Sequence, residues 1–500
     1  MTKAANFSPP AMALLALTMG VIQLLGHTYE WLLWGSMVVL TVIGFWGLAR
    51  LIFVSSFVTA WSVYGVSLAL AYGLGTLNTM TSGYVDGSAM FLVNFVGPSA
   101  LGRAEGIMLL IVSALIYIGH IDRNKLIPTE SFTDSERQST LVVLMLFCIG
   151  TFAALGTGQL GYAGVQNGSG NSMQVSPLAS LVASCLSAVT ALAILAYGSQ
   201  PPSRARSLVM FLCLLLALTQ LTQGRRPMMF NALTILIAFF AVRSVKGFLT
   251  PKVILVLLLT VATLAFGSRF YLATRIAGYT LPADATLSER LAGGWDVLTH
   301  PEEQGLNQQL EENQSTRTFV VGYVGELIEG YDKTGGTTGG DLLILNVAAA
   351  LPTAIWPGKW RIIARVGSDE IACHPKMGLP DWDAANTVIT EGLCDFGWTG
   401  MLLYPIAMVG LIVLGNLAVR RTNILIRTMI AFSSIKTLLG VEGNLTGYIV
   451  DLRNMAILAV GTALIVAAFN WYQKQPLVIH HREQKALRKQ RLAELRAGRP

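Results

Sequence analysis

Long apolar segments recur along most of this 500-residue chain, and most of them are long enough to cross a lipid bilayer as a helix. The hydrocarbon core is about 30 Å thick, which a helix of roughly 20 apolar residues spans. Only 13% of the residues are charged and the mean hydropathy is +0.57, whereas charged residues make up about 25% of a soluble domain. The sequence therefore predicts an all-α polytopic membrane protein.

The apolar pattern predicts about twelve transmembrane helices. They are residues 11–25, 31–49, 51–74, 104–121, 139–158, 177–197, 207–222, 228–246, 251–268, 398–419, 424–441 and 452–472. No small-residue cleavage site follows the first segment, so we expect a span there and not a signal peptide. A weaker apolar stretch, 88–100, contains Gly97 and Pro98 and is expected to be interfacial or re-entrant.

Basic residues gather in alternate connections between these spans. They are Arg50, Arg123, Lys125, Arg137, Arg204, Arg206, Arg243, Lys246, Lys252, Arg420, Arg421 and those of the tail from Lys474 to Arg499. The positive-inside rule assigns this side to the cytoplasm, so a bacterial inner-membrane protein with both termini in the cytoplasm is expected. This distribution accounts for the net charge of +7 without nucleic-acid binding.

Four regions follow from this topology. They are an N-terminal membrane bundle of about nine spans (1–268), a large periplasmic loop (269–397), a C-terminal group of three spans (398–472) and a basic cytoplasmic tail (473–500). The loop is the soluble-like region, and we expect it to carry short helices as a lid. Its apolar run from Leu342 to Ile355 is expected to form an amphipathic helix on the membrane surface.

The five cysteines divide between the spans and the loop. Cys148, Cys185 and Cys213 lie in predicted spans, where cysteine is usually a packing residue. Cys373 and Cys394 both lie in the loop, where an oxidising compartment permits a disulfide between them. Two separate thiols remain the alternative.

Two arginines stand out because the topology places them on the outer side. Arg225 and Arg226 form a short outside turn between two spans, where the positive-inside bias should deplete arginine. A bound phosphate or pyrophosphate would explain them, because the guanidinium fork matches such an anion bidentately. The alternatives are contacts with outer-leaflet headgroups or a topology shifted by one span.

Further arginines lie in the predicted loop. They are Arg269, Arg275, Arg290, Arg317, Arg361 and Arg365. Arg269 and Arg275 follow a span closely and are expected at headgroup depth. Each alone is a surface contact, but several converging on one cavity would bind a polyanionic lipid. The last outside turn, residues 442–447 with Asp451 and Arg453 beyond it, either joins that cavity or is simply solvated.

Glu391 is the candidate base. It lies about two helical turns before the following span becomes purely apolar, where a carboxylate is costly unless it is paired or functional. It could accept a proton from a hydroxyl nucleophile, balance an arginine, or form a structural ion pair. His374 is an alternative base. With six histidines and no second ligand at metal spacing, neither a metal nor another cofactor is expected. No phosphate-binding or dinucleotide fingerprint occurs, which disfavours ATP-driven transport.

Three segments carry a resemblance to a known family. They are Gln223–Arg226, placed before a large loop that follows the ninth span, then Leu351–Lys359 and Glu391–Gly400. In these respects the chain resembles the Wzy-type oligosaccharide repeat-unit polymerases of O-antigen and exopolysaccharide synthesis. These share a superfamily with the O-antigen ligases. The resemblance covers the topology of nearly the whole chain but motifs over only a small part of it.

The resemblance implies a membrane glycosyltransferase. Such polymerases transfer a glycan from undecaprenyl pyrophosphate to another lipid-linked repeat unit at the periplasmic face, without a nucleotide sugar or metal. Arg225 and Arg226 would bind the pyrophosphate, and Glu391 would be the base. Arg269, Arg317, Arg361 and Arg365 are further candidate ligands. The expected partners are the lipid-linked oligosaccharide and the bilayer, with a chain-length regulator and a flippase as further candidates.

Two departures from the superfamily patterns bear on this reading. Ligases place a histidine before a glycine, with ten residues between them, at the start of the helix after the loop, and here Asn386 takes the histidine position relative to Gly397. Asparagine cannot act as a base, so ligase chemistry is disfavoured. A paired pattern described for some polymerases, an arginine and a glycine with ten residues between them, is also absent at Arg225, Arg269, Arg361 and Arg365. The rival functions are a ligase-type transferase, a lipid-linked oligosaccharide flippase and a structural partner in envelope assembly.

Overall fold

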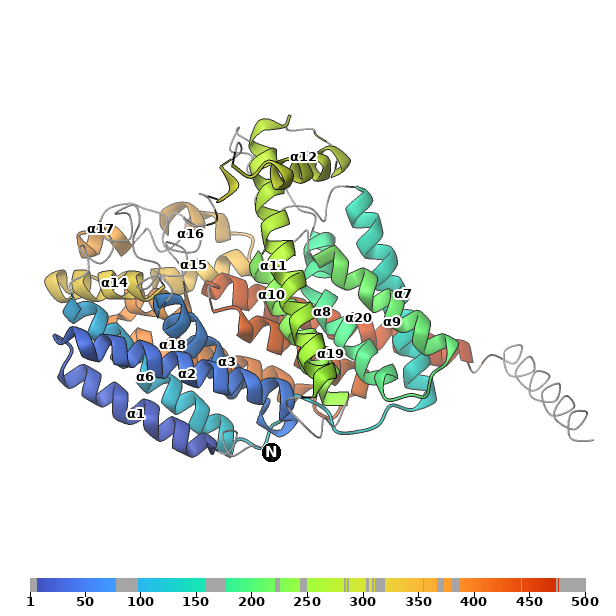
Figure 1. Ribbon diagram of the computed structural model, residues 1–500, viewed down its shortest axis with the longest axis horizontal. Helices are drawn as coiled ribbons and strands as arrows, with labels where there is room; N and C mark the ends of the chain where they lie inside the picture. The colour runs from blue at the N-terminus through green and yellow to red at the C-terminus, as the bar shows by residue number, and fades with distance from the viewer. Residues whose placement is uncertain are drawn as a thin grey trace, which may run out of the picture.

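The computed structural model describes residues 7–77, 98–157, 177–220, 225–242, 250–282, 285, 287–302, 305–307, 310, 320–353, 355–366, 373–379, 387–441, 443–473 and 475. The secondary structure of these residues is helical throughout (Figure 1). This confirms the all-α fold class.

Twelve long helices coincide in order with the predicted spans. They are α1 (Pro9–Leu25), α2 (Glu30–Phe53), α3 (Ala60–Ala69) with the π-helical turn η3 (Leu70–Leu74), α6 (Pro98–Ile121), α7 (Asp134–Gly156), α8 (Pro177–Gly198), α9 (Arg204–Thr219), α10 (Arg225–Val242), α11 (Pro251–Thr280), α18 (Val388–Ala418), α19 (Ile424–Leu439) and α20 (Leu445–Gln473). A 3-10 turn, η2 (Ser55–Phe57), precedes α3. Between α11 and α18 lie α12 (Leu287–Thr299), α14 (Val320–Thr334), α15 (Asp341–Ala350), α16 (Lys359–Val366) and α17 (His374–Met377).

Length separates these helices into two groups. Within the described residues, eight helices are long and apolar enough to cross a membrane. The others, α1, α9, α10 and α19, have 17, 16, 18 and 16 residues. At about 1.5 Å per residue they reach only about 24–27 Å, less than the hydrocarbon thickness. The helices indicate a multi-pass membrane protein, and a count of twelve spans remains a prediction.

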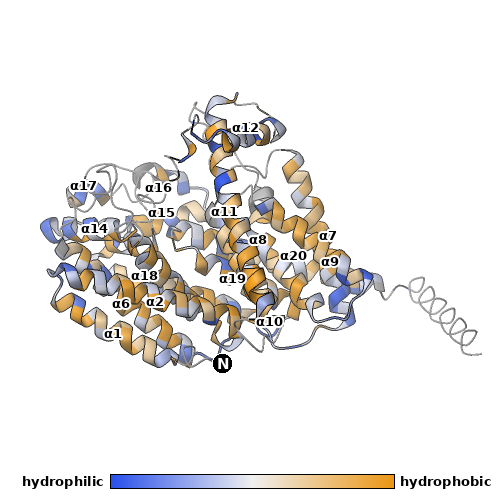
Figure 2. Ribbon diagram, in the orientation of Figure 1, coloured by the Kyte–Doolittle hydropathy of each residue, from blue (hydrophilic) through white to orange (hydrophobic). Residues whose placement is uncertain are grey.

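The long helices of the bundle consist mainly of hydrophobic residues (Figure 2), and many of their large apolar side chains are exposed. On α11 the exposed side chains include Leu255, Leu258, Leu259 and Val261. A soluble protein rarely leaves so large an apolar surface uncovered. The exposed face of α11 therefore fits contact with acyl chains.

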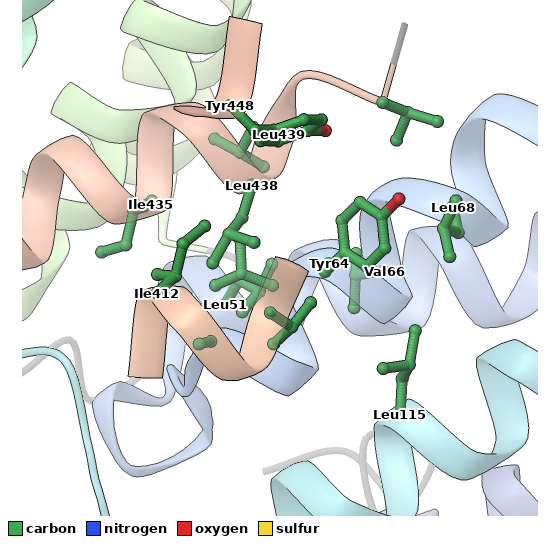
Figure 3. Close-up of a cluster of buried hydrophobic side chains, with 14 of the residues drawn as sticks. Leu51, Tyr64, Val66, Leu68, Leu115, Ile412, Ile435, Leu438, Leu439 and Tyr448 are labelled. Atoms are coloured by element: carbon green, nitrogen blue, oxygen red, sulfur yellow. The ribbon is translucent and has the colours of Figure 1, made fainter. Parts of the chain in front are cut away.

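The helices before and after the predicted loop share one core. The helix α8 packs against α7, α9 and α10, which precede the predicted loop in the sequence. It also packs against α19 and α20, which follow the loop. Figure 3 shows the same mixture in a cluster drawn from α2, α3, α6, α18, α19 and α20. Its labelled members are Leu51, Tyr64, Val66, Leu68, Leu115, Ile412, Ile435, Leu438, Leu439 and Tyr448. The described helices of regions 1–268 and 398–472 thus pack into one bundle.

Two ends of this bundle can be defined from side-chain contacts. At the loop end, Glu391 near the start of α18 accepts a hydrogen bond from the backbone of Leu445 at the start of α20. At the tail end, Arg420 after α18 donates to Asn124, which follows α6. The helices α6 and α18 therefore run in the same direction, from the loop end to the tail end.

Two predicted boundaries differ from the ends of the helices, and a third agrees with a bend. The loop was expected from residue 269, but α11 continues to Thr280, because no proline interrupts it between Pro251 and Pro282. The span expected from residue 398 agrees with the part of α18 that follows a bend at Phe396 and Gly397, although the helical segment before the bend starts at Val388. The second and third helices are separated by η2 and do not meet at Arg50. Residues 98–100 of the predicted re-entrant stretch 88–100 begin α6, and the rest of it lies outside the described residues.

The helix α18 bends sharply near its start. Phe396 and Gly397 have non-helical backbone angles, and Gly397 adopts φ 60° and ψ −143°, which a residue with a Cβ rarely tolerates. The segment 388–395, called the pre-kink segment below, folds back on the rest of the helix. A Cβ atom added to Gly400 would lie 1.9 Å from the carbonyl oxygen of Gly392. Two glycines therefore permit the contact that the bend creates.

The predicted surface helix from Leu342 to Ile355 is shorter and better packed than expected. It corresponds to α15, which ends at Ala350 and contacts α18, α20 and α16. Leu342 and Leu345 are buried against these helices, whereas Leu343 and Ile344 are exposed. Only one side of α15 is left for a membrane surface.

Candidate functional site

Glu391 lies in a buried junction between three helices at the loop end. Glu391 is only 1% exposed. The side-chain amide of Asn346 in α15 donates to Oε1 at 3.1 Å, and the backbone N–H of Leu445 donates to Oε2 at 2.6 Å. The second donor is the first N–H of α20, where the helix dipole favours a negative charge. The carboxylate is thus held in one orientation by α15 and α20.

Asn346 extends this junction. Its Oδ1 accepts from the backbone N–H of Thr446 at 3.2 Å and from the Thr446 hydroxyl. Both ends of the amide are used, which determines its orientation. We call Asn346, Glu391, Leu445 and Thr446 the Glu391 junction. It includes the predicted outside turn before α20, so this turn does meet the candidate base.

Asp395, one helical turn after Glu391, was not identified from the sequence. Its carboxylate accepts from the backbone N–H groups of Leu342 and Leu343 at 3.1 and 2.8 Å, and from the hydroxyls of Thr338 and Tyr404. Asp395 therefore caps the N-terminus of α15 from another helix. With four donors on two oxygens, this carboxylate has a structural role.

Cys373 and Cys394, the pair that the sequence offered for a disulfide, are bonded in the structure with Cα atoms 5.7 Å apart. The bond ties α17 to the pre-kink segment. His374, the alternative base, follows Cys373 and is fully buried, with Nε2 2.8 Å from the Tyr323 hydroxyl. It lies in the packing between α14 and α17.

A second polar cluster lies at the loop end of α19 and α20. The Thr437 hydroxyl donates to Asp451 at 2.6 Å, and Arg453 donates to the carbonyl oxygen of Ala350 at 2.9 Å. Lys436 precedes Thr437 in α19, directly beside the residue that binds Asp451. Lys436 was missed in the sequence, although a lysine inside a predicted span is itself a signal of function.

The backbone of Arg225 and Arg226 begins α10, and their side chains lie outside the described residues. Phe230 shows at which end of the bundle α10 begins, because it is one helical turn after Arg226 on the same face of the helix. The Phe230 ring approaches a Cβ position on Gly440 to within 3.4 Å, and the Gly440 carbonyl accepts from Tyr448 of α20. The start of α10 is therefore at the loop end, as the Glu391 junction is.

The other candidate arginines do not gather at Glu391 in the described structure. Arg269 is exposed on α11 and donates to Asn307 at 3.4 Å, beside α12. Arg361 is exposed on α16. Arg317 and the side chain of Arg365 lie outside the described residues. Arg103, which the sequence did not single out, forms an ion pair with Asp332 between α6 and α14.

Glu105 is a buried acid inside α6. It is fully buried, and neither carboxylate oxygen has a partner of good hydrogen-bond geometry among the described residues, although the Thr76 hydroxyl lies close to it. The nearby Thr76 hydroxyl donates to the carbonyl oxygen of Tyr72. The sequence predicted a span from residue 104, which placed Glu105 at its edge. Because α6 begins at Pro98, Glu105 is instead two turns inside the helix.

Two cavities lie at the tail end, opposite the Glu391 junction. One of about 280 Å³ lies between the connection after α6 and the turn after α18. The other, about 330 Å³, lies between residues 127–132 and the ends of α8 and α10. Among the described residues, no group of histidine, cysteine and acidic side chains is arranged to hold a metal ion.

Comparison with protein-family models, with curated proteins and with solved structures finds no match to this chain. The class that the fold defines is a multi-pass helical membrane protein. A polar junction built around Glu391 lies at the loop end of its bundle.

Proposed function

We propose that the protein is a glycosyltransferase that polymerises undecaprenyl-pyrophosphate-linked repeat units at the outer face of a bacterial inner membrane. The observation that supports this proposal best is that Glu391 and the start of α10, which carries Arg225 and Arg226, lie at the same end of the bundle. Lys436 and Arg453 add positive charge at that end. A base and several cations at one face are what transfer from a pyrophosphate donor needs.

The proposed reaction moves one proton and breaks one bond. The acceptor hydroxyl oxygen attacks the anomeric carbon of the donor glycan as its proton passes to Glu391. The bond from that carbon to the pyrophosphate breaks, and undecaprenyl pyrophosphate leaves with the electron pair. Guanidinium groups of Arg225 and Arg226 stabilise the charge of the leaving group. Since Glu391 is 1% exposed, its contact with Asn346 has to open when the acceptor binds.

The direct test is to incubate purified protein with lipid-linked repeat units and to look for a ladder of chain lengths. Arg225→Ala should abolish the ladder and leave expression intact. Arg421→Ala, an exposed arginine at the tail end, is the matched control and should polymerise normally. Polymer of normal length from Arg225→Ala would refute the pyrophosphate role of this residue.

The variant Glu391→Gln distinguishes a catalytic role of Glu391 from a purely structural one. Glutamine keeps the shape and an acceptor for Leu445 but cannot take a proton. If Glu391 is the base, turnover should fall by roughly 10²–10⁴-fold while the melting temperature changes little. A large loss of stability with normal turnover of the remaining folded protein would instead assign Glu391 to structure alone.

A second candidate function is transport of the lipid-linked oligosaccharide, and Glu105 favours it. An ionisable side chain buried within a span commonly marks a transport pathway, and Glu105 is fully buried in α6. Under the polymerase proposal, Glu105→Gln should retain the ladder. Under the transport alternative, wild-type protein in vesicles should move the lipid-linked glycan without lengthening it, and Glu105→Gln should stop that movement.

A further inference from the structure

The cavity of about 280 Å³ at the tail end brings together segments distant in the sequence. Its walls come from the connection after α6, from the last turns of α18 and from α19. The residues that matter for its chemistry are Arg123, Lys125, Arg420, Arg427, Ile127 and Leu417. The backbone N–H of Leu126 donates to the Val58 carbonyl at 3.0 Å, which fixes the connection against the start of α3.

The charges around this cavity do not balance. Glu130 is the acidic residue of the lining, and it forms an ion pair with Arg427. Among the described residues, Arg123, Lys125 and Arg420 have no carboxylate ion pair. Burial lowers the pKa of Lys125 from its ordinary value, and Asp122 opposes this shift. Within the described part of the chain, the lining therefore has four cations and one carboxylate, Glu130, with Asp122 beside Lys125, so the local charge is net positive.

Polar contacts hold two of these cations in place. Lys125 donates to the Asp122 carbonyl at 2.6 Å, and Arg420 donates to the Asn124 side chain at 3.4 Å. The contact between Arg420 and Asn124 links the turn after α18 to the connection after α6. Ordered cations lose less conformational entropy when an anion binds than free side chains do.

The rest of the cavity is apolar. Ile127, Val413 and Leu417 line it. Leu417 is 38% exposed, and Leu414, on the same part of α18, is 62% exposed, so the wall continues into the apolar outer surface. A free phosphate ion would leave this wall unused, whereas a phospholipid would cover it with an acyl chain. The volume is also below the roughly 300–1,000 Å³ of pockets for drug-sized ligands and fits a small headgroup.

We propose that this cavity binds the phosphate group of an anionic phospholipid, with Arg123 and Arg420 as the principal contacts and an acyl chain along Leu417. Both guanidinium groups can bind phosphate oxygens bidentately. The inference does not depend on the proposed glycosyltransferase activity, because it concerns the opposite end of the bundle.

The test measures thermal unfolding of the purified full-length protein in detergent, titrated separately with phosphatidylglycerol, phosphatidylcholine and inorganic phosphate. Phosphatidylglycerol should raise the melting temperature, since a ligand that binds the folded state stabilises it. Phosphatidylcholine and inorganic phosphate at the same concentration should have little effect. The double variant Arg123→Gln/Arg420→Gln should bind phosphatidylglycerol about thirtyfold more weakly, on the basis of about 1 kcal/mol for each basic residue.

Arg421→Gln is the matched control. Arg421 is the exposed neighbour of Arg420 in the same turn, carries the same charge and does not line the cavity. It should respond to phosphatidylglycerol as wild type does. Equal losses in Arg420→Gln and Arg421→Gln would overturn the proposal in favour of general surface charge. An equal response to inorganic phosphate would overturn the lipid assignment.

A second measurement covers the case in which the double variant unfolds early. Arg123→Gln removes a side chain for which no hydrogen bond is described, so it should fold normally. Native mass spectrometry then counts the phosphatidylglycerol molecules retained by wild type and by Arg123→Gln. We expect less retention by the variant. The same retention in both proteins would refute a role for Arg123.

Discussion

In the segment from Glu391 to Gly400, one of the three on which the family resemblance rests, several residues each have a different structural role. Glu391 joins α15 and α20, while Cys394 is bonded to Cys373. Asp395 caps α15, and Gly397 makes the bend. These residues would be needed for folding whether or not one of them is catalytic. Their roles can therefore be separated only by measuring stability and activity together.

Gly400→Ala should destabilise the protein. The new methyl group would lie 1.9 Å from the carbonyl oxygen of Gly392, so the pre-kink segment would have to move away. Overpacking of this kind costs about 1–3 kcal/mol. Gly410→Ala is the control in the same helix, because nothing lies within 4 Å of its Cβ position. Thermal unfolding should show a loss for Gly400→Ala and no loss for Gly410→Ala.

Asp395→Ala should also lower stability, by about 2 kcal/mol or more, because two backbone N–H groups of α15 lose their buried acceptor. Asp296→Ala is a suitable comparison, since its side chain is 65% exposed and pairs only with His300 in the described contacts. We expect that change to stay within about 0.5 kcal/mol. Comparable melting temperatures for the two variants would contradict the capping role of Asp395.

At the scale of elements, the apolar pattern predicted a helix in each of twelve places, and the structure has one in each. The errors concern the ends of the helices, where a helix continues beyond the apolar segment that predicted it. Hydropathy falls at Arg269, but the backbone of α11 remains helical to Thr280 because charged residues do not break a helix. Glu105 was placed at the edge of a span for the same reason, since the polar first turns of α6 hid its true start.

The candidate site could be predicted only in part. The acidic residue Glu391, the cysteine pair and the turn before α20 were visible as local anomalies in composition. The bend at Gly397 and the cap made by Asp395 were not, because both depend on which distant helix lies beside the segment. The sequence alone cannot place α15 against α18, since no local pattern encodes that contact. Several loop arginines were expected to converge on one cavity. Arg269 and Arg361 do not, because both are exposed, on α11 and α16.

The disulfide between Cys373 and Cys394 links two elements that few other bonds connect. It closes a sequence separation of 21 residues, for which the chain-entropy model gives about 3 kcal/mol. Reduction should therefore lower the melting temperature. The variant Cys373→Ser/Cys394→Ser should start lower and show no further change on reduction. Equal sensitivity of that variant and wild type to reductant would mean that the effect arises elsewhere.

At the scale of the molecule, the two ends of the bundle differ in chemistry. The loop end holds the Glu391 junction and the Lys436, Asp451 and Arg453 cluster, whereas the tail end holds both described cavities. Arg50 at the end of α2 donates to the Phe7 carbonyl at 3.2 Å, so the described start of the chain is at the tail end. If the Glu391 junction is catalytic and the tail-end cavity binds a phospholipid, the two sites face opposite sides of the membrane. Each of them then implies an orientation of the protein in the bilayer.

This arrangement makes a topology prediction that covers the whole chain. If the tail end faces the cytoplasm, a membrane-impermeant maleimide added to intact cells should label Lys333→Cys but not Thr422→Cys. Lys333 is an exposed residue of α14, and Thr422 is an exposed residue of the turn after α18. Background labelling should be low, because Cys148, Cys185 and Cys213 are buried and the other two cysteines are bonded to each other. Thr422→Cys should react only after the cells are opened. Labelling in the reverse order would place the Glu391 junction in the cytoplasm and exclude periplasmic polymerisation.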